Sequence, residues 1–329
     1  MSRGRRSAMA SRGRSGAFVL FRVAAGPRIG HGHLRRAETL AEAIGRPACV
    51  SIRGAGARTA LPILAAGTAD AALARTGAAV LVLDDPVTDA GRAWCRAAHR
   101  RGVPTVSIHD LGLAPVPSTL AIDGSVVRTR TDWPAGAVLE GLQYAVIRPP
   151  VRNRRSAGVR RVLISLGGGP RRALVAAIAA EVSRRLPGVE IIVPAPRTDS
   201  LWTRHARLVP AATGLADVLS QVDAAILGGG VSLYEAVAAG VPAVAVSVVP
   251  AQRPTIDGFA ARGLVRDGGH AGGLRPAAIA CTIADAFDRA AADADWRRQV
   301  GREGPRAIDG RGAARVARAI LAVAEPCRA

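Results

Sequence analysis

Short apolar, β-branched runs alternate along this chain with Ala-rich segments of helical period. In residues 34–44, for example, apolar side chains recur on one face of a helix. This alternation is typical of βαβ units on parallel sheets. Strands are predicted at residues 17–23, 48–52, 79–83, 104–108, 119–122, 161–166, 190–193, 224–227 and 243–248. Helices are predicted at residues 34–44, 91–101, 171–185, 215–221, 231–239 and 255–262, and from 276 to the end.

A Pro- and Arg-rich connector at residues 148–158 separates the alternating segments into two sets. The length of 329 residues also suits two domains. We therefore expect an α/β protein with two Rossmann-like, doubly wound domains at residues 17–148 and 159–329, joined by a linker at 149–158. A cleft is expected between them, where the carboxyl ends of the strands converge.

The chain contains no lysine, so all 45 of its Lys+Arg cations are arginine. This excludes a Walker A phosphate loop and a protein kinase site, which both need a lysine. It also excludes Schiff-base chemistry on a lysine, as pyridoxal phosphate requires. Arginine, backbone amides and helix ends are left as the means of holding an anion.

The formal net charge of +20 raises the question of nucleic acid. Arginine is scattered, however, and aromatic residues make up only 3% of the chain, too few for base stacking. Part of the excess lies in residues 1–16, which are predicted to form a disordered basic tail, or to precede a true start at Met9. Nucleic acid is therefore a disfavoured partner.

The four cysteines are isolated, and no histidine stands near them at ligand spacing. They predict reduced thiols in a cytoplasmic protein, without a metal site. No export signal and no membrane-spanning run is recognised in the sequence.

The first of three Gly-rich turns, at residues 26–33, follows a predicted strand and opens a helix. It lacks the dinucleotide pattern, and Arg53 stands where a ribose-binding acid would be expected, so a nicotinamide enzyme is disfavoured. His33 lies at the start of the helix, where the helix dipole disfavours imidazolium and favours a neutral base. The alternative is a helix cap that faces solvent.

The other two turns contain Gly167 and Gly168, and Gly229 and Gly230. Exposed N–H groups at such turns can hold a phosphate without lysine. After the third turn, Ser232 and Glu235 also have the spacing of a capping box, in which they would only satisfy their own helix. Two turns of this kind in one half favour a phosphorylated ligand.

Polar residues also follow two other predicted strands. Asp84 and Asp85 are candidates for catalysis or for capping the next helix, and His109 and Asp110 have the same ambiguity. Gln252 and the Arg253 guanidinium can reach a diphosphate or sugar hydroxyls, or belong to an ordinary loop.

Five segments together resemble the nucleotide-sugar hydrolase family of pseudaminic acid biosynthesis and its spore-coat polysaccharide relatives. The resemblance runs in the expected order over roughly residues 17–270. The segments are G-x-G-H-x-x-R at 30–36, YAVIRP at 144–149, VLISLGG at 162–168, GGVSLYE at 229–235 and QRP at 252–254. The resemblance implies a GT-B fold and an NDP-sugar substrate, with a UDP-sugar as the first expectation, in surface-glycan or nonulosonic-acid-type biosynthesis.

The same resemblance implies roles for single residues. His33 would be the general base that activates water at the anomeric carbon, with inversion and with neither metal nor cofactor. Gly229, Gly230 and Ser232 would hold the pyrophosphate, with Glu235 on the ribose. The other diphosphate candidates are Gly167, Gly168, Gln252 and Arg253, and the sugar-side candidates are Gly32, Arg36, Asp84 and Asp85.

The chain also departs from the family pattern. Residues 84–89 read DDPVTD where the family has D-H-Y-G-L-D, so the His and Tyr of the sugar pocket are lost. Val231 replaces a serine, and Arg171 and Arg172 stand where an acid is usual. The identity of the sugar therefore stays open, as does the choice between hydrolysis, transfer to an acceptor, and binding without turnover.

Overall fold

The computed structural model describes residues 18–26, 29–65, 67–111, 113–128, 130–151, 158–167, 171–194, 206–210 and 215–325. The basic segment 1–16, Gly168, Cys327 and most of the linker lie outside these ranges. Within them the chain forms two six-stranded sheets, one in each half. All strand pairs in both sheets are parallel, as the alternation predicts.

The N-terminal sheet has the strand order β2-β1-β3-β4-β5-β6. Its order reverses at β1, so the crevice of this sheet lies between the carboxyl ends of β1 and β3. The elements of this half are β1 (Val19–Ala24), α1 (Gly32–Ile44), β2 (Ala48–Arg53), α2 (Ala69–Thr76), β3 (Val80–Asp84), α3 (Thr88–Arg100), β4 (Thr105–His109), β5 (Ser118–Asp123), β6 (Ala135–Glu140) and the short helix η1 (Leu142–Tyr144).

The C-terminal sheet has the strand order β12-β11-β10-β7-β8-β9, which reverses between β7 and β10. The glycine turn that follows β10 lies at the crevice of this sheet, beside the end of β7, since a Cβ on Gly228 would lie 3.0 Å from the carbonyl oxygen of Leu166. The elements here are β7 (Arg161–Ser165), α4 (Arg172–Arg185), β8 (Glu190–Pro194), β9 (Arg207–Val209), α5 (Ala216–Leu219), β10 (Ala224–Gly228), α6 (Val231–Ala239), β11 (Ala243–Ser247), η3 (Pro250–Gln252), α7 (Arg253–Ala261), β12 (Arg266–His270), α8 (Pro276–Ala292), α9 (Ala294–Ala307) and α10 (Gly312–Ala324).

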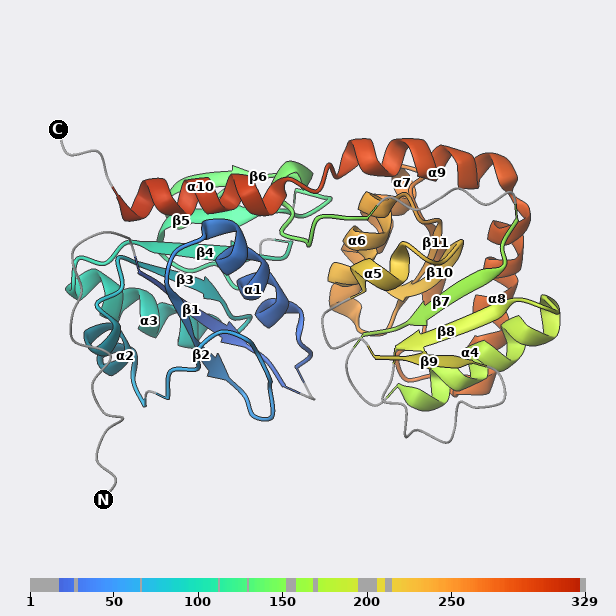
Figure 1. The fold of residues 1–329 in the computed structure, drawn as a ribbon, viewed down its shortest axis with the longest axis horizontal. Helices are drawn as coiled ribbons and strands as arrows, with labels where there is room; N and C mark the ends of the chain where they lie inside the picture. The colour runs from blue at the N-terminus through green and yellow to red at the C-terminus, as the bar shows by residue number, and fades with distance from the viewer. Residues whose placement is uncertain are drawn as a thin grey trace, which may run out of the picture.

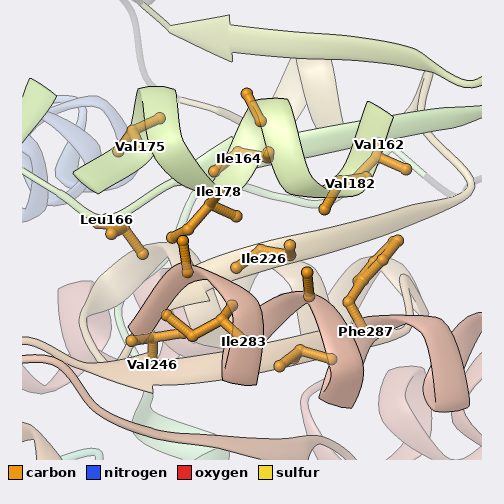
Figure 2. Packing of buried hydrophobic residues seen from close by; sticks show 14 of the residues in the cluster. Val162, Ile164, Leu166, Val175, Ile178, Val182, Ile226, Val246, Ile283 and Phe287 are labelled. Atoms are coloured by element: carbon orange, nitrogen blue, oxygen red, sulfur yellow. The ribbon is translucent and has the colours of Figure 1, made fainter. Parts of the chain in front are cut away.

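Both sheets are covered on both faces, and their strands are therefore near-continuous apolar runs. In the C-terminal half, α4 and α8 pack on one face, where Ile178 and Ile283 meet Ile226 of β10 (Figure 2). Helices α5, α6 and α7 cover the other face. Helices α2 and α3 cover one face of the N-terminal sheet.

The last helix, α10, crosses back and packs beside α1 on the N-terminal sheet (Figure 1). Its apolar side chains Val316 and Ile320 are fully buried in the N-terminal core. The crossing passes close to the segment after η1, since a Cβ on Gly312 would collide with the carbonyl oxygen of Ala145. α10 therefore packs in the N-terminal core, although its residues belong to the predicted C-terminal domain, 159–329.

The predicted strands, and the predicted helices up to residue 262, are present with ends shifted by a few residues. The segment predicted as helical from 276 to the end forms three helices, α8, α9 and α10, and residues 326–329 lie outside the described ranges. The sequence reading did not include α2 or the strands β6, β9 and β12. β12 has the sequence RDGGH and lies at a sheet edge, so backbone pairing rather than an apolar pattern defines it. Throughout the described ranges, each helix is too short or too polar to cross a bilayer.

Candidate active site

A cleft of about 440 Å³ opens between the two halves of the molecule. Residues that follow β1, β3, β4 and β5 line it from the N-terminal half, and residues that follow β10 and β11 line it from the other half. The sequence candidates on its walls are Gly32, His33, Arg36, Asp84, Asp85, Gly229, Gly230 and Gln252. Seven of these eight residues lie at the two crevices, because the carboxyl ends of parallel strands share one edge of a sheet. The eighth, Gln252, follows β11.

His33 lies in the first turn of α1 and forms a hydrogen bond with Asp84 at the end of β3. Its Nδ1 is 2.7 Å from Asp84 Oδ1. Nη2 of Arg36 also lies 2.8 Å from this Nδ1, so the nitrogen has both a donor and an acceptor beside it. Because an ionised carboxylate only accepts, we assign the hydrogen to Nδ1, which leaves Nε2 as the acceptor of the ring. The N-cap of α1 is His31, without a side-chain cap bond. His33 therefore does not cap the helix, and it lines the cleft.

Arg36 lies one turn further along α1 and fixes the Asp84 carboxylate from the other side. Its Nε and Nη2 donate to the two oxygens of Asp84, each at 2.7 Å, and its Nη1 donates to Asp110. Asp84 is 3% exposed. Burial acts to raise the pKa of Asp84, but the Arg36 cation and His33 outweigh burial and hold that pKa well below its usual range. Asp84 is thus an ionised, doubly oriented partner for His33.

Asp85 makes contacts with other residues than Asp84 does. Its oxygens accept hydrogen bonds from Arg53, with Nη2 at 2.7 Å and Nε at 2.9 Å, and from the backbone N–H of Val87 at 3.0 Å. Neither Asp84 nor Asp85 caps α3, whose N-cap is Val87. The paired aspartates therefore divide between the His33 cluster and a structural ion pair with Arg53.

On the C-terminal side, Gly229 and Gly230 precede α6, with Gly230 as its N-cap. A Cβ on Gly229 would lie 2.9 Å from Cβ of Gln252 and 3.0 Å from Cγ1 of Ile256, so only glycine fits there. Gln252 Oε1 accepts from the backbone N–H of Val248 at 2.9 Å, which holds the end of β11 against this turn. The first N–H groups of α6 therefore start at the cleft, where an anion would be stabilised.

The two halves approach closely at this point. A Cβ on Gly32, at the start of α1, would lie 3.6 Å from Cγ2 of Val231, at the start of α6. The N-termini of both helices thus face the same cleft, and His33 and the glycine turn lie on opposite walls of it.

Four other candidates in the described part of the chain are not among the residues that line the cleft. Ser232 and Glu235 lie further along α6, and Ser232 is not the N-cap, so the capping-box alternative does not apply. Gly167, with φ of 81°, follows β7 and is exposed. Arg253 forms ion pairs with Asp257 and Asp267. Gly168 lies outside the described residues.

Glu235 nevertheless has an unusual environment. Burial raises its pKa to about 7, and the Arg148 cation opposes this rise. Its carboxyl group therefore changes charge near neutral pH.

The structure places His109 and Asp110, which were ambiguous candidates from the sequence, on the cleft wall, and Asp110 pairs with Arg36. It also adds Tyr234 and Thr255, which were not selected from the sequence. The strand-end position of His109 and Asp110 was the available signal. No such sequence signal exists for Tyr234, which follows a glycine turn as an ordinary helical residue. Its hydroxyl accepts a hydrogen bond from the backbone N–H of Val126, in the other half of the molecule.

Among the residues that the structure describes, no three His, Cys, Asp or Glu side chains come together as a metal ion would require. The cleft offers acids, two histidines, an arginine and helix ends. Groups of these kinds can carry out acid–base catalysis and bind an anion.

No protein-family model matches the chain. The spore coat polysaccharide biosynthesis protein SpsG of Bacillus subtilis (strain 168) is 26% identical over 147 residues, which are 40% of this chain and 43% of that protein. The match thus spans less than half of that relative's length.

Solved structures match over nearly the whole chain. The calicheamicin glycosyltransferase CalG4 has a TM-score of 0.64 at 16% identity, covering 95% of this chain and 100% of that one. MurG of Acinetobacter baumannii has a TM-score of 0.58 at 14% identity, covering 93% and 99%. With two parallel, doubly wound domains, the protein has the GT-B fold.

Proposed function

We propose that the protein is an enzyme of glycan biosynthesis that binds an NDP-sugar in the cleft and transfers its glycosyl group to a hydroxyl deprotonated by His33. The observation that carries this proposal is the His33–Asp84 pair on the wall opposite the glycine turn of α6. The similarity to SpsG, a protein named for polysaccharide biosynthesis, supports the same class of substrate.

The step needs only groups that this chain supplies. The attacking oxygen gives its proton to Nε2 of His33 while it bonds to the anomeric carbon. The bond from that carbon to the diphosphate breaks, and the electron pair leaves with the nucleoside diphosphate. The N–H groups at the start of α6 stabilise the departing anion, and Asp84 stabilises the imidazolium that forms.

Water as the attacking molecule gives hydrolysis, which is what the resemblance to the pseudaminic acid pathway enzyme implies. An alcohol in the same place gives glycosyl transfer, which is the alternative. Both reactions share the geometry of His33, Asp84 and the glycine turn.

The test begins with a thermal-shift screen of UDP, dTDP, ADP, GDP and CDP, followed by an assay of nucleoside diphosphate release from the corresponding sugar. A ligand bound only by the folded state raises the melting temperature. In His33→Gln we expect kcat to fall by about 10²- to 10⁴-fold, with the nucleoside diphosphate still bound. His31→Gln, two residues earlier and exposed, is the matched control. Wild-type turnover in His33→Gln would refute the role of the base.

A further inference from the structure

The backbone is strained in the segment that follows β4. Leu111 has φ of 56° and Ala114 has φ of 51°, and within the described ranges they are the only non-glycine residues with positive φ. A side chain rarely adopts this conformation, and such residues persist only where the surroundings hold them. Strain of this kind concentrates at functional sites, and this segment lines the cleft.

Buried polar groups hold the strained segment in place. His109 Nδ1 donates to the carbonyl oxygen of Leu113 at 3.1 Å, and the backbone N–H of Leu111 donates to Ser125 Oγ at 2.5 Å. Because a carbonyl only accepts, Nδ1 carries the hydrogen, and Nε2 accepts from Ser107 Oγ at 2.8 Å. Burial lowers the pKa of His109, so the ring is neutral and this arrangement is stable.

This arrangement places the apolar side chains of Leu111 and Leu113, here called the apolar wall, in the cleft that His33 also lines. Leu111 is buried, whereas Leu113 is 54% exposed. Val249, which is 40% exposed, lines the same cleft from the C-terminal half. Exposed leucine costs free energy in water, and a contiguous apolar surface in a cleft is typical of a ligand contact.

The apolar wall belongs to the half of the molecule that carries the base. His33, Leu111 and Leu113 all come from the N-terminal half, and the glycine turn comes from the other half. The molecule that gives its proton to His33 must therefore lie on the side of the apolar wall. Water alone would leave this wall without a contact.

We propose that the acceptor is an alcohol with an apolar body, which packs against Leu111 and Leu113 while its hydroxyl meets His33. This inference rests on the proposed function and names the acceptor class. The acceptor oxygen bonds to the anomeric carbon, its proton goes to Nε2 of His33, and the carbon–diphosphate bond breaks with its electron pair leaving on the nucleoside diphosphate.

The test uses the full chain, the nucleotide sugar selected by the thermal-shift screen, and two alcohols, 1-hexanol and the polar 1,2,6-hexanetriol. Mass spectrometry detects the hexyl glycoside, and a coupled assay measures nucleoside diphosphate release. We expect the hexyl glycoside to form in preference to the triol product. Leu113→Ser should raise the KM for 1-hexanol about tenfold, the loss expected when a leucine contact is removed.

Leu274→Ser is the matched control, because Leu274 is also 54% exposed and does not line the cleft. It should leave both KM values unchanged, while Leu113→Ser should move the KM for the nucleotide sugar by less than twofold. Nucleoside diphosphate release without any hexyl glycoside would overturn the inference and leave the proposed function standing. An equal rise in both KM values would place the wall on the donor and also overturn it. No release in either arm would refute the proposed function itself.

Discussion

Nδ1 of His33 lies 2.7 Å from Oδ1 of Asp84, although 51 residues separate them in the chain. The contact exists because β1 and β3 are neighbours in the sheet and their carboxyl ends meet at its crevice. With the hydrogen assigned to Nδ1, which donates it to Asp84, Nε2 is the ring nitrogen that can accept a proton. This relationship is the centre of the proposed mechanism.

Asp84→Asn should preserve the shape of the site while removing the charge that orients His33. We expect kcat for nucleoside diphosphate release to fall by about 10²- to 10⁴-fold, since an amide no longer favours the required tautomer or stabilises imidazolium. The affinity for the nucleoside diphosphate should change little. Asp89→Asn, an exposed aspartate of the same sequence cluster, is the control and should be silent. A normal kcat in Asp84→Asn would contradict the orienting role.

Arg36→Met should destabilise the fold, because it leaves the Asp84 carboxylate buried without its cation. The free energy of unfolding at pH 7 should fall by about 3–5 kcal/mol. In the wild type the pKa of Asp84 is lowered in the folded state, so the stability it contributes is present above the unfolded pKa of about 4 and is lost as pH falls below it. The difference between wild type and variant should therefore shrink at acidic pH.

Urea denaturation at pH 7 and at pH 3 measures this change. Arg35→Met is the neighbouring control, because Arg35 pairs with Glu38 at a more exposed position and should cost about 0–1 kcal/mol. A loss in Arg36→Met that did not depend on pH would argue against the Asp84 explanation.

Glu235→Gln should change the pH dependence of stability. Burial raises the pKa of Glu235 in the folded state to about 7, above the ordinary glutamate value of 4.5. The folded state thus binds the proton more tightly, and wild-type stability declines as pH rises from about 4.5 through 7. Denaturation at pH 5 and pH 8 should show a smaller decline in the variant, whereas exposed Glu42→Gln should follow the wild type. Parallel curves for Glu235→Gln and the wild type would disprove this account.

Ala114→Gly should stabilise the protein, since glycine adopts φ of 51° without the penalty of a Cβ. We expect a gain of about 0.5–1 kcal/mol in the free energy of unfolding, after the entropy of the unfolded chain is included. Ala93→Gly, at an exposed position inside α3, should have the opposite sign, a loss of about 1 kcal/mol. Thermal denaturation of both variants distinguishes strain at Ala114 from a general effect of glycine.

Much of the fold could be predicted from local pattern. The strands with buried, β-branched runs, such as β3 and β10, are visible because both faces of each sheet are covered. The edge strand β12 could not be predicted, because its pairing with β11 uses backbone groups of a polar, Gly-rich segment. The return of α10 to the N-terminal sheet could not be predicted either. Its periodicity shows that the helix has an apolar face but does not indicate which surface that face packs against.

The candidate site divides in the same way. His33 and the glycines before α6 could be selected from sequence, because strand ends and helix starts are local features. The position of His33 at a helix start is also a local feature, but its contact with a partner is not. That Asp84 contacts His33 while the adjacent Asp85 pairs with Arg53 depends on side-chain direction at the end of β3.

The sequence by itself determined the α/β class, the two sets of parallel strands and the absence of lysine-dependent phosphate chemistry. It also selected His33 as the candidate base. Only the tertiary structure decided that Arg36 joins Asp84 to Asp110, that Ser232 is not a helix cap, and that Leu113 is exposed in the cleft that His33 also lines. The physical reason is the separation along the chain between the residues that interact. Periodicity and turn chemistry act over a few residues, whereas the contacts that orient a base or expose an apolar side chain are made by strands that meet only when the sheet has formed.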